Sequence, residues 1–154
     1  MLFTSISGSA DKKTLKIIFS KPNIWEIQLE KYLMKHVAIV DDNKANLNLY
    51  KHYLEDQYLV NTYTNGKDLL DQLSNTESLP DFVILDVMMP EMSGYEVCRL
   101  IKTDEKYRDI KVFICSSLNS QVDIDESQQV MADDYIVKPV KSKDLHYFIE
   151  KHSC

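Results

Sequence analysis

The sequence predicts an α/β fold in which a doubly wound, five-stranded parallel sheet is flanked by five helices. Two observations predict this class. From residue 36 onward, short apolar runs alternate with longer amphipathic stretches, as in a parallel sheet that helices cover on both faces. The composition is that of an ordinary globular protein, with 44% hydrophobic and 27% charged residues, and 154 residues suit one domain.

The expected elements follow one another in strict alternation. Helical spacing of apolar residues is clearest in the first helix, at Leu47, Tyr50 and Leu54, and in the last helix, at Leu145 and Ile149. The predicted strands are His36–Val40, Tyr58–Thr62, Phe82–Leu85, Lys111–Cys115 and Tyr135–Val137. The predicted helices are Asn46–Glu55, Gly66–Leu73, Tyr95–Lys102, Val122–Met131 and Ser142–His152.

Residues 1–33 lie outside this alternation, so we divide the chain into an N-terminal extension and a domain of residues 34–154. Thr14–Phe19 has the pattern of a strand, and Pro22–Leu33 has that of a short helix. Two interpretations stay open. Either the extension packs on the domain or on a partner, or Met34 is the natural start of the protein.

Charge, cysteines and hydropathy exclude several classes of protein. The net charge is −6 and no run of Lys and Arg offsets it, which argues against direct nucleic-acid binding. Cys98, Cys115 and Cys154 are far apart and odd in number, so they indicate neither disulfides nor a zinc site and suit a reducing cytoplasm. The apolar runs are too short to span a membrane, and the N-terminus lacks a secretory signal. We therefore expect a soluble protein.

Polar residues follow four of the five predicted strands, at the sheet edge where ligands bind in such folds. Three are acids, and carboxylates placed together repel one another unless a cation lies between them. Mg²⁺ is the small, oxygen-seeking ion that suits such a group. A carboxylate nucleophile beside a lysine, a hydroxyl and a metal suits phosphoryl transfer. The residues are Asp41, Asp42, Asp86, Ser116, Ser117 and Lys138.

Each of these residues has an ordinary structural interpretation when it is taken alone. An Asp pair after a strand is commonly a helix cap or a turn, and Lys138-Pro139 after a strand is commonly plain loop. Their conjunction at one edge of the sheet favours a functional site.

The motifs around these residues resemble the receiver domain of two-component response regulators over residues 36–152. The resemblance is carried, in order, by VAIVDDN (37–43), DFVILDVMMPEMSGYEV (81–97), VFICSSL (112–118) and DDYIVKPV (133–140). It implies a flavodoxin-like sheet with the strand order 2-1-3-4-5. It also implies a cytoplasmic phosphoprotein of a two-component or phosphorelay system that carries an aspartyl phosphate and binds Mg²⁺.

By this resemblance, Asp86 is the phosphoacceptor. Asp42 binds the metal directly, Asp41 binds it largely through water, and the main-chain carbonyl of Met88 completes the protein ligands. Lys138 pairs with Asp86 and then with the phosphoryl group.

The resemblance also implies a conformational switch. Ser116 would move to donate its hydroxyl to a phosphoryl oxygen, and the small Ser117 beside it keeps the approach open. Tyr135 would turn inward as Ser116 moves, whereas ordinary strand packing is the alternative interpretation of this residue. A cis bond is expected between Lys138 and Pro139, since X-Pro bonds are those in which the cis form costs little.

Three features depart from the usual family pattern. Met131 stands where a Gly commonly ends the fourth helix, so this helix is expected to end differently. Ser93 replaces the usual Asp or Asn before Gly94, a change that keeps side-chain-to-backbone bonding. Met88 and Leu118 flank the phosphorylation site with apolar side chains that orient no water, which predicts a long-lived phosphoryl group.

Rivals from other classes fail on particular residues. A phosphatase of the haloacid dehalogenase type needs a second Asp two residues after the nucleophile, where this chain has Met88. A nucleotide- or flavin-binding domain needs a phosphate-cradling loop after the first strand, where Asp41 and Asp42 would repel phosphate. The alternative that stays open is a receiver-shaped interaction module that binds its partner independently of phosphorylation.

The expected upstream partner is a histidine kinase or a histidine phosphotransfer protein, which donates from phosphohistidine. Because the chain ends soon after its last predicted helix, we expect a stand-alone receiver with a downstream protein target, unless the chain is a fragment. Asp123, Asp125 and Glu126 make the fourth helix acidic, as a solvated face or a partner surface. Homodimerisation on phosphorylation stays open, and slow hydrolysis of its own phosphoryl group is the one reaction expected.

Overall fold

The computed structural model describes residues 23–117, 125–126 and 128–153. Contacts between Cα atoms divide the chain between Leu33 and Met34, and each unit is described by itself. In the first unit, helix α2 spans Ile24–Leu33 and buries none of its side chains. The expected strand Thr14–Phe19 lies outside the described residues, as do Leu118 and Asp123.

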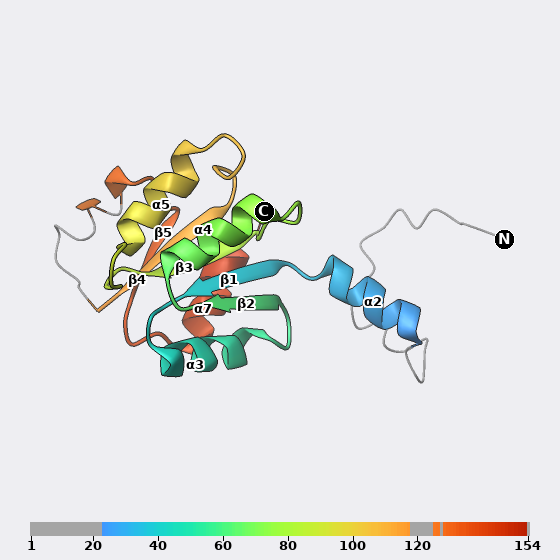
Figure 1. The fold of residues 1–154 in the computed structure, drawn as a ribbon. Coiled ribbons are helices and arrows are strands. Elements are labelled where there is room, and N and C mark those ends of the chain that lie inside the picture. The colour runs from blue at the N-terminus through green and yellow to red at the C-terminus, as the bar shows by residue number, and fades with distance from the viewer. Residues whose placement is uncertain (1–22, 118–124, 127, 154) are drawn as a thin grey trace. The chain divides into compact units, whose positions relative to one another are not determined.

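The second unit contains one parallel sheet of five strands (Figure 1). Its strand order is β2-β1-β3-β4-β5, which confirms the expected 2-1-3-4-5 order. All five predicted strands are confirmed, with ends that differ by at most one residue. The strands are β1 (His36–Val40), β2 (Leu59–Tyr63), β3 (Phe82–Asp86), β4 (Lys111–Ser116) and β5 (Asp134–Val137).

Helices cover both faces of this sheet, with α4 and α5 on one face and α3 and α7 on the other (Figure 1). The doubly wound arrangement predicted from the sequence is therefore confirmed. Residues 125, 126, 128 and 129 are also helical and belong to the predicted fourth helix. The other helices are α3 (Lys44–Leu54), α4 (Gly66–Asn75), α5 (Gly94–Thr103) and α7 (Ser142–Lys151). Among the described residues, no helix has the length and apolar character needed to cross a membrane.

The central strands are buried on both faces, and their side chains alternate between two cores. In β3, Val83 and Leu85 pack with the helices α4 and α5, whereas Phe82 and Ile84 pack with α3 and α7. Alternation with a period of two places successive side chains on opposite faces of a strand, so a doubly covered strand is apolar throughout. Burial on both faces fixes the register of β1 and β3 in the sheet, and hence the positions of the residues that follow these strands.

The helical segment before β5 ends at Gln129, and Met131, in the turn that follows, has a φ of 60°. This is the left-handed conformation that glycine adopts at no steric cost. We expected a different helix end because Met replaces the usual Gly, and that expectation is wrong for the backbone. Met131 takes the conformation that Gly favours, with its amide donating to the carbonyl of Gln128.

Replacing Met131 with Gly is therefore expected to stabilise the protein. A residue with a Cβ costs roughly 1–2 kcal/mol in the left-handed region, and Gly avoids this cost. Gly is also more flexible in the unfolded chain, which offsets the gain by roughly 0.5–1 kcal/mol. We expect the free energy of unfolding, measured by urea denaturation, to rise by about 0.5–1 kcal/mol. The matched control is Gln129→Gly, in the helical segment itself, which should lower the same free energy. A loss of stability in Met131→Gly would contradict this account.

Candidate functional site

Three carboxylates meet at the carboxyl ends of the central strands. Asp86 is the last residue of β3, Asp41 directly follows β1, and Asp42 comes next in the chain. One oxygen from each lies within 4.8 Å of the others, a grouping that can hold a metal ion. Asp41 and Asp86 are only 2% and 6% exposed, whereas Asp42 is open to solvent. The set consists of hard oxygen donors, which suits Mg²⁺.

Lys138 reaches this group from the end of β5. Its Nζ donates to Oδ1 of Asp86 at 2.8 Å and to Oδ2 of Asp41 at 2.9 Å. Its backbone amide donates to the carbonyl of Ser116 at 2.8 Å, so the ends of β4 and β5 are joined just below the site. The bond between Lys138 and Pro139 is cis, as expected.

One lysine does not balance the charge of three acids. Burial raises the pKa of Asp86, the hydrogen bond and the charge of Lys138 lower it, and the charges of Asp41 and Asp42 raise it again, with a net rise. Burial works against the charge on Lys138, but hydrogen bonds to Asp86 and Asp41 outweigh it and raise the pKa of this lysine. An ionised site with one ammonium group thus favours binding of a further cation.

The loop after β3 is shaped by one glycine and one serine. A Cβ on Gly94 would lie 2.2 Å from the carbonyl oxygen of Asp86, so only glycine lets α5 begin this close to the strand. Ser93 caps α5, with its hydroxyl accepting from the amide of Glu96 and the Glu96 carboxylate accepting from the amide of Ser93. Side-chain-to-backbone bonding at Ser93 is therefore confirmed.

The remaining predicted residues lie around the three acids. Ser116 ends β4 and is 1% exposed, while Ser117 is exposed and lines a pocket that Lys138 also lines. Met88 follows β3 by two residues and is 66% exposed. Tyr135 is half-buried on β5 and packs against the core beneath α4 and α5. The sheet thus brings Ser116, Ser117 and Met88 to the edge where the acids lie, whereas Tyr135 lies within β5, three residues before Lys138.

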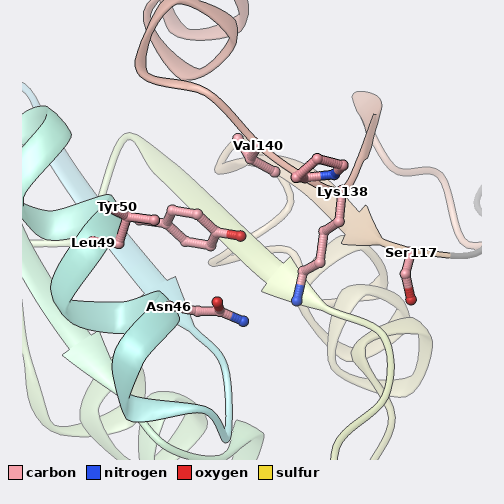
Figure 2. Close-up of a pocket in the computed structure, with 7 residues that line it drawn as sticks. Asn46, Leu49, Tyr50, Ser117, Lys138 and Val140 are labelled. Atoms are coloured by element: carbon pink, nitrogen blue, oxygen red, sulfur yellow. The ribbon is translucent and has the colours of Figure 1, made fainter.

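Helix α3 contributes residues that were not predicted from the sequence to lie at the site. Figure 2 shows Asn46 and Tyr50 projecting from α3 toward the ammonium group of Lys138. The amide of Asn46 donates from Nδ2 to Oδ2 of Asp41 at 3.0 Å. Burial raises the pKa of Tyr50 to about 12. The available signal was that Asn46 falls in the first turn of the helix that follows the two acids.

A family model decides what kind of domain carries this site. The model described as the response regulator receiver domain matches residues 37–150, which is most of the chain. The chain belongs to the response regulator receiver family. Receiver domains are signalling modules of two-component systems, and aspartate phosphorylation and Mg²⁺ binding are standard for them.

Curated relatives are longer proteins with a similar domain. This receiver is 35% identical over 123 residues to the transcriptional regulatory protein YvrH of Bacillus subtilis, covering 75% of this chain and 48% of that protein. It is 36% identical over 113 residues to the response regulator SaeR of Staphylococcus epidermidis, covering 73% and 47%. The chain therefore spans about half the length, or less, of the first curated relatives it matches.

Solved receiver structures agree in fold. The BeF3-activated receiver domain of DrrB superposes with a TM-score of 0.69 at 32% identity, covering 77% of this chain and 97% of that one. The chemotaxis protein CheY4 of Vibrio cholerae superposes with a TM-score of 0.71 at 26% identity, covering 77% and 98%. The share of this chain that both structures cover is close to the share that the family model matches at residues 37–150.

The raised pKa of Asp86 predicts a pH-dependent gain in stability for Asp86→Asn. A carboxyl whose pKa is higher in the folded protein binds protons more readily there, so stability falls as the pH rises through the unfolded and then the folded pKa. In the presence of a chelator at pH 7, we expect Asp86→Asn to melt a few degrees above the wild type. The difference should disappear below about pH 3, where Asp86 is protonated in both states.

The matched control for this thermal melt is Asp71→Asn, which changes an exposed acid on α4, away from the site. We expect its melting temperature to follow that of the wild type across the whole pH range. A lower melting temperature for Asp86→Asn at pH 7 would mean that the ionised carboxylate stabilises the fold, and would contradict the charge imbalance described above.

Proposed function

We propose that this receiver takes a phosphoryl group from a phosphohistidine donor onto Asp86, with Mg²⁺ bound beside it, and then signals to a partner protein. The observation that carries this proposal is the bond from Lys138 to Asp86 within a group of three acids at the sheet edge. Lys138 could balance the charge of one buried carboxylate. Here Asp86 and Asp41 share it, and Asp42 adds a third negative charge. The excess of negative charge favours a bound cation, and that cation supplies the positive charge that the phosphoryl oxygens need.

The metal ligands in this proposal are Asp42, Asp86 and the main-chain carbonyl of Met88, with Asp41 acting largely through water. The residues present fit the ion because they offer oxygen donors and an excess of negative charge. When bound, Mg²⁺ would supply positive charge for the equatorial phosphoryl oxygens. Lys138 would supply the second positive charge, since it already lies 2.8 Å from Asp86.

In the transfer step, an oxygen of Asp86 forms a bond to phosphorus as the bond from phosphorus to the imidazole nitrogen of the donor breaks. The electron pair of that bond stays on the imidazole, which takes up a proton from solvent. Ser116 then donates its hydroxyl to a phosphoryl oxygen, and Tyr135 turns inward toward the space that Ser116 leaves. This local change alters the face made by the fourth helix, β5 and α7, to which a partner binds.

The partners we propose are a histidine kinase or histidine phosphotransfer protein upstream and a protein target downstream, in the cytoplasm. Residues 1–33 form a separate N-terminal extension in this proposal, ahead of a receiver domain at 34–154. Homodimerisation on phosphorylation and binding through the acidic residues Asp125 and Glu126 are compatible with it. The competing function is an interaction module that works without phosphorylation.

Mass spectrometry after incubation with Mg²⁺ and acetyl phosphate tests the proposed reaction. We expect one phosphoryl adduct on the wild type, lost with base or hydroxylamine and absent when a chelator replaces Mg²⁺. Asp86→Asn should show no adduct, and Lys138→Ala should lose most of it, by about 10²-fold in rate. An adduct of equal size on Asp86→Asn would contradict the assignment. No adduct on the wild type, with undiminished partner binding by Asp86→Asn, would favour the competing function.

The apolar side chain at Met88 predicts slow loss of the phosphoryl group. Met88 is exposed beside Asp86 and offers no group to orient an attacking water. We expect the phosphoprotein to persist far beyond seconds, and Met88→Glu to shorten its half-life by at least about tenfold. The measurement is the decay of the adduct after the phosphodonor is removed. A half-life of seconds in the wild type, or no change in Met88→Glu, would show that this position does not limit hydrolysis.

A further inference from the structure

Asp41 is held by three donors from three different directions. Its Oδ1 accepts from the backbone amide of Asn43 at 2.8 Å. Its Oδ2 accepts from Nδ2 of Asn46 at 3.0 Å and from Nζ of Lys138 at 2.9 Å. A carboxylate has about four acceptor positions, so these three bonds leave about one for a further donor such as a metal-bound water.

Asn46 differs from the other two donors in charge and in freedom. Its amide is neutral, so it can orient Asp41 without adding a positive charge that would oppose a divalent cation. Lys138 is shared with Asp86, and in the proposed reaction it turns to the phosphoryl group, which removes one bond from Asp41. Asn46 has no such second task among the hydrogen bonds described, so its bond to Asp41 would persist.

We propose that Asn46 is a positioning residue for the metal site, which holds Asp41 in the orientation that Mg²⁺ binding requires. The inference rests on the proposed function, because it assigns a role within the same site. Groups that orient the ligands of a metal, without touching it, commonly change metal affinity by about 10–100-fold when they are lost. The site itself is suited to this role because Asp41 is buried and its two carboxylate oxygens accept from different donors, which restricts its orientation.

The backbone of α3 makes Asn46 a rigid support. Asn43 caps the helix, and its side chain accepts from the amides of Ala45 and Asn46. One turn later, Tyr50 is buried in the core between α3 and the sheet. Because the first turn is capped and anchored, the side chain of Asn46 loses little further freedom when it bonds to Asp41. This favours a single orientation of the Asp41 carboxylate.

A packing role is the alternative interpretation of Asn46. It lines an open pocket of about 320 Å³ together with Leu49, Tyr50 and Lys138 (Figure 2). Leu49 lies on the same helix and lines the same pocket, and its hydrocarbon side chain has no hydrogen-bonding atom. Leu49→Ala therefore removes packing from this pocket without touching Asp41, and serves as the matched control.

The test is isothermal titration calorimetry of Mg²⁺ alone into the full chain. Asn46→Leu keeps the branched shape of Asn but removes the donor, and it should weaken Mg²⁺ binding by about tenfold. Asn46→Gln keeps an amide donor, for which the open pocket has room, and should restore most of the affinity. Leu49→Ala should bind Mg²⁺ like the wild type. Phosphorylation of Asn46→Leu by acetyl phosphate should recover when Mg²⁺ is saturating, since only the metal affinity has changed.

Two results would overturn the inference in distinguishable ways. Equal Mg²⁺ affinity of the wild type and Asn46→Leu would exclude the positioning role and leave the proposed function intact. No Mg²⁺ binding by the wild type would remove the metal site itself, and with it both proposals. Melts in chelator show whether each variant is folded; Asn46→Ala, the smaller truncation, replaces Asn46→Leu if the latter does not fold.

Discussion

The hydrogen bonds from Lys138 to Asp86 and Asp41 are the interaction on which this structure depends. They join the carboxyl ends of β1, β3 and β5, three strands that are far apart in the sequence. A buried ion pair contributes to the fold only where its geometry is good and further hydrogen bonds satisfy its remaining atoms. Here one lysine faces three carboxylates, so the site keeps an excess of negative charge. The same contact therefore links the strands and leaves the site able to bind a metal ion and then a phosphoryl group.

The rest of the domain keeps Lys138, Asp86 and Asp41 in fixed positions at the edge of the sheet. The apolar side chains of β1, β3 and β4 alternate between two cores, and each core anchors one pair of helices to the sheet. A slip of one residue in β3 would move its whole set of side chains to the opposite face, so burial on both sides fixes the position of Asp86. Gly94 then lets α5 start against the carbonyl of Asp86, so the loop that contains Met88 begins and ends close to the site.

The sequence could predict the fold because its apolar runs and amphipathic stretches have periods that differ clearly, and the five strands were found to within one residue at each end. It could also predict the acids and Lys138, because parallel strands bring their carboxyl ends to one edge. Asn46 was not predicted, since an Asn in a first helical turn is usually explained by capping, and its bond to Asp41 depends on how α3 leaves the sheet. The conformation of Met131 was missed for a related reason: residue type favours Gly there, but the chain path imposes the left-handed turn on Met.

A crystal structure of the full chain grown with Mg²⁺ and beryllofluoride, a mimic of the phosphoryl group, tests the central claim most directly. The account predicts a metal about 2.1 Å from oxygens of Asp42, Asp86 and the Met88 carbonyl, with beryllofluoride on Asp86 and Lys138 turned toward it. Asn46 should still donate to Asp41. A structure in which Lys138 keeps both carboxylates and neither metal nor beryllofluoride binds Asp86 would contradict the account.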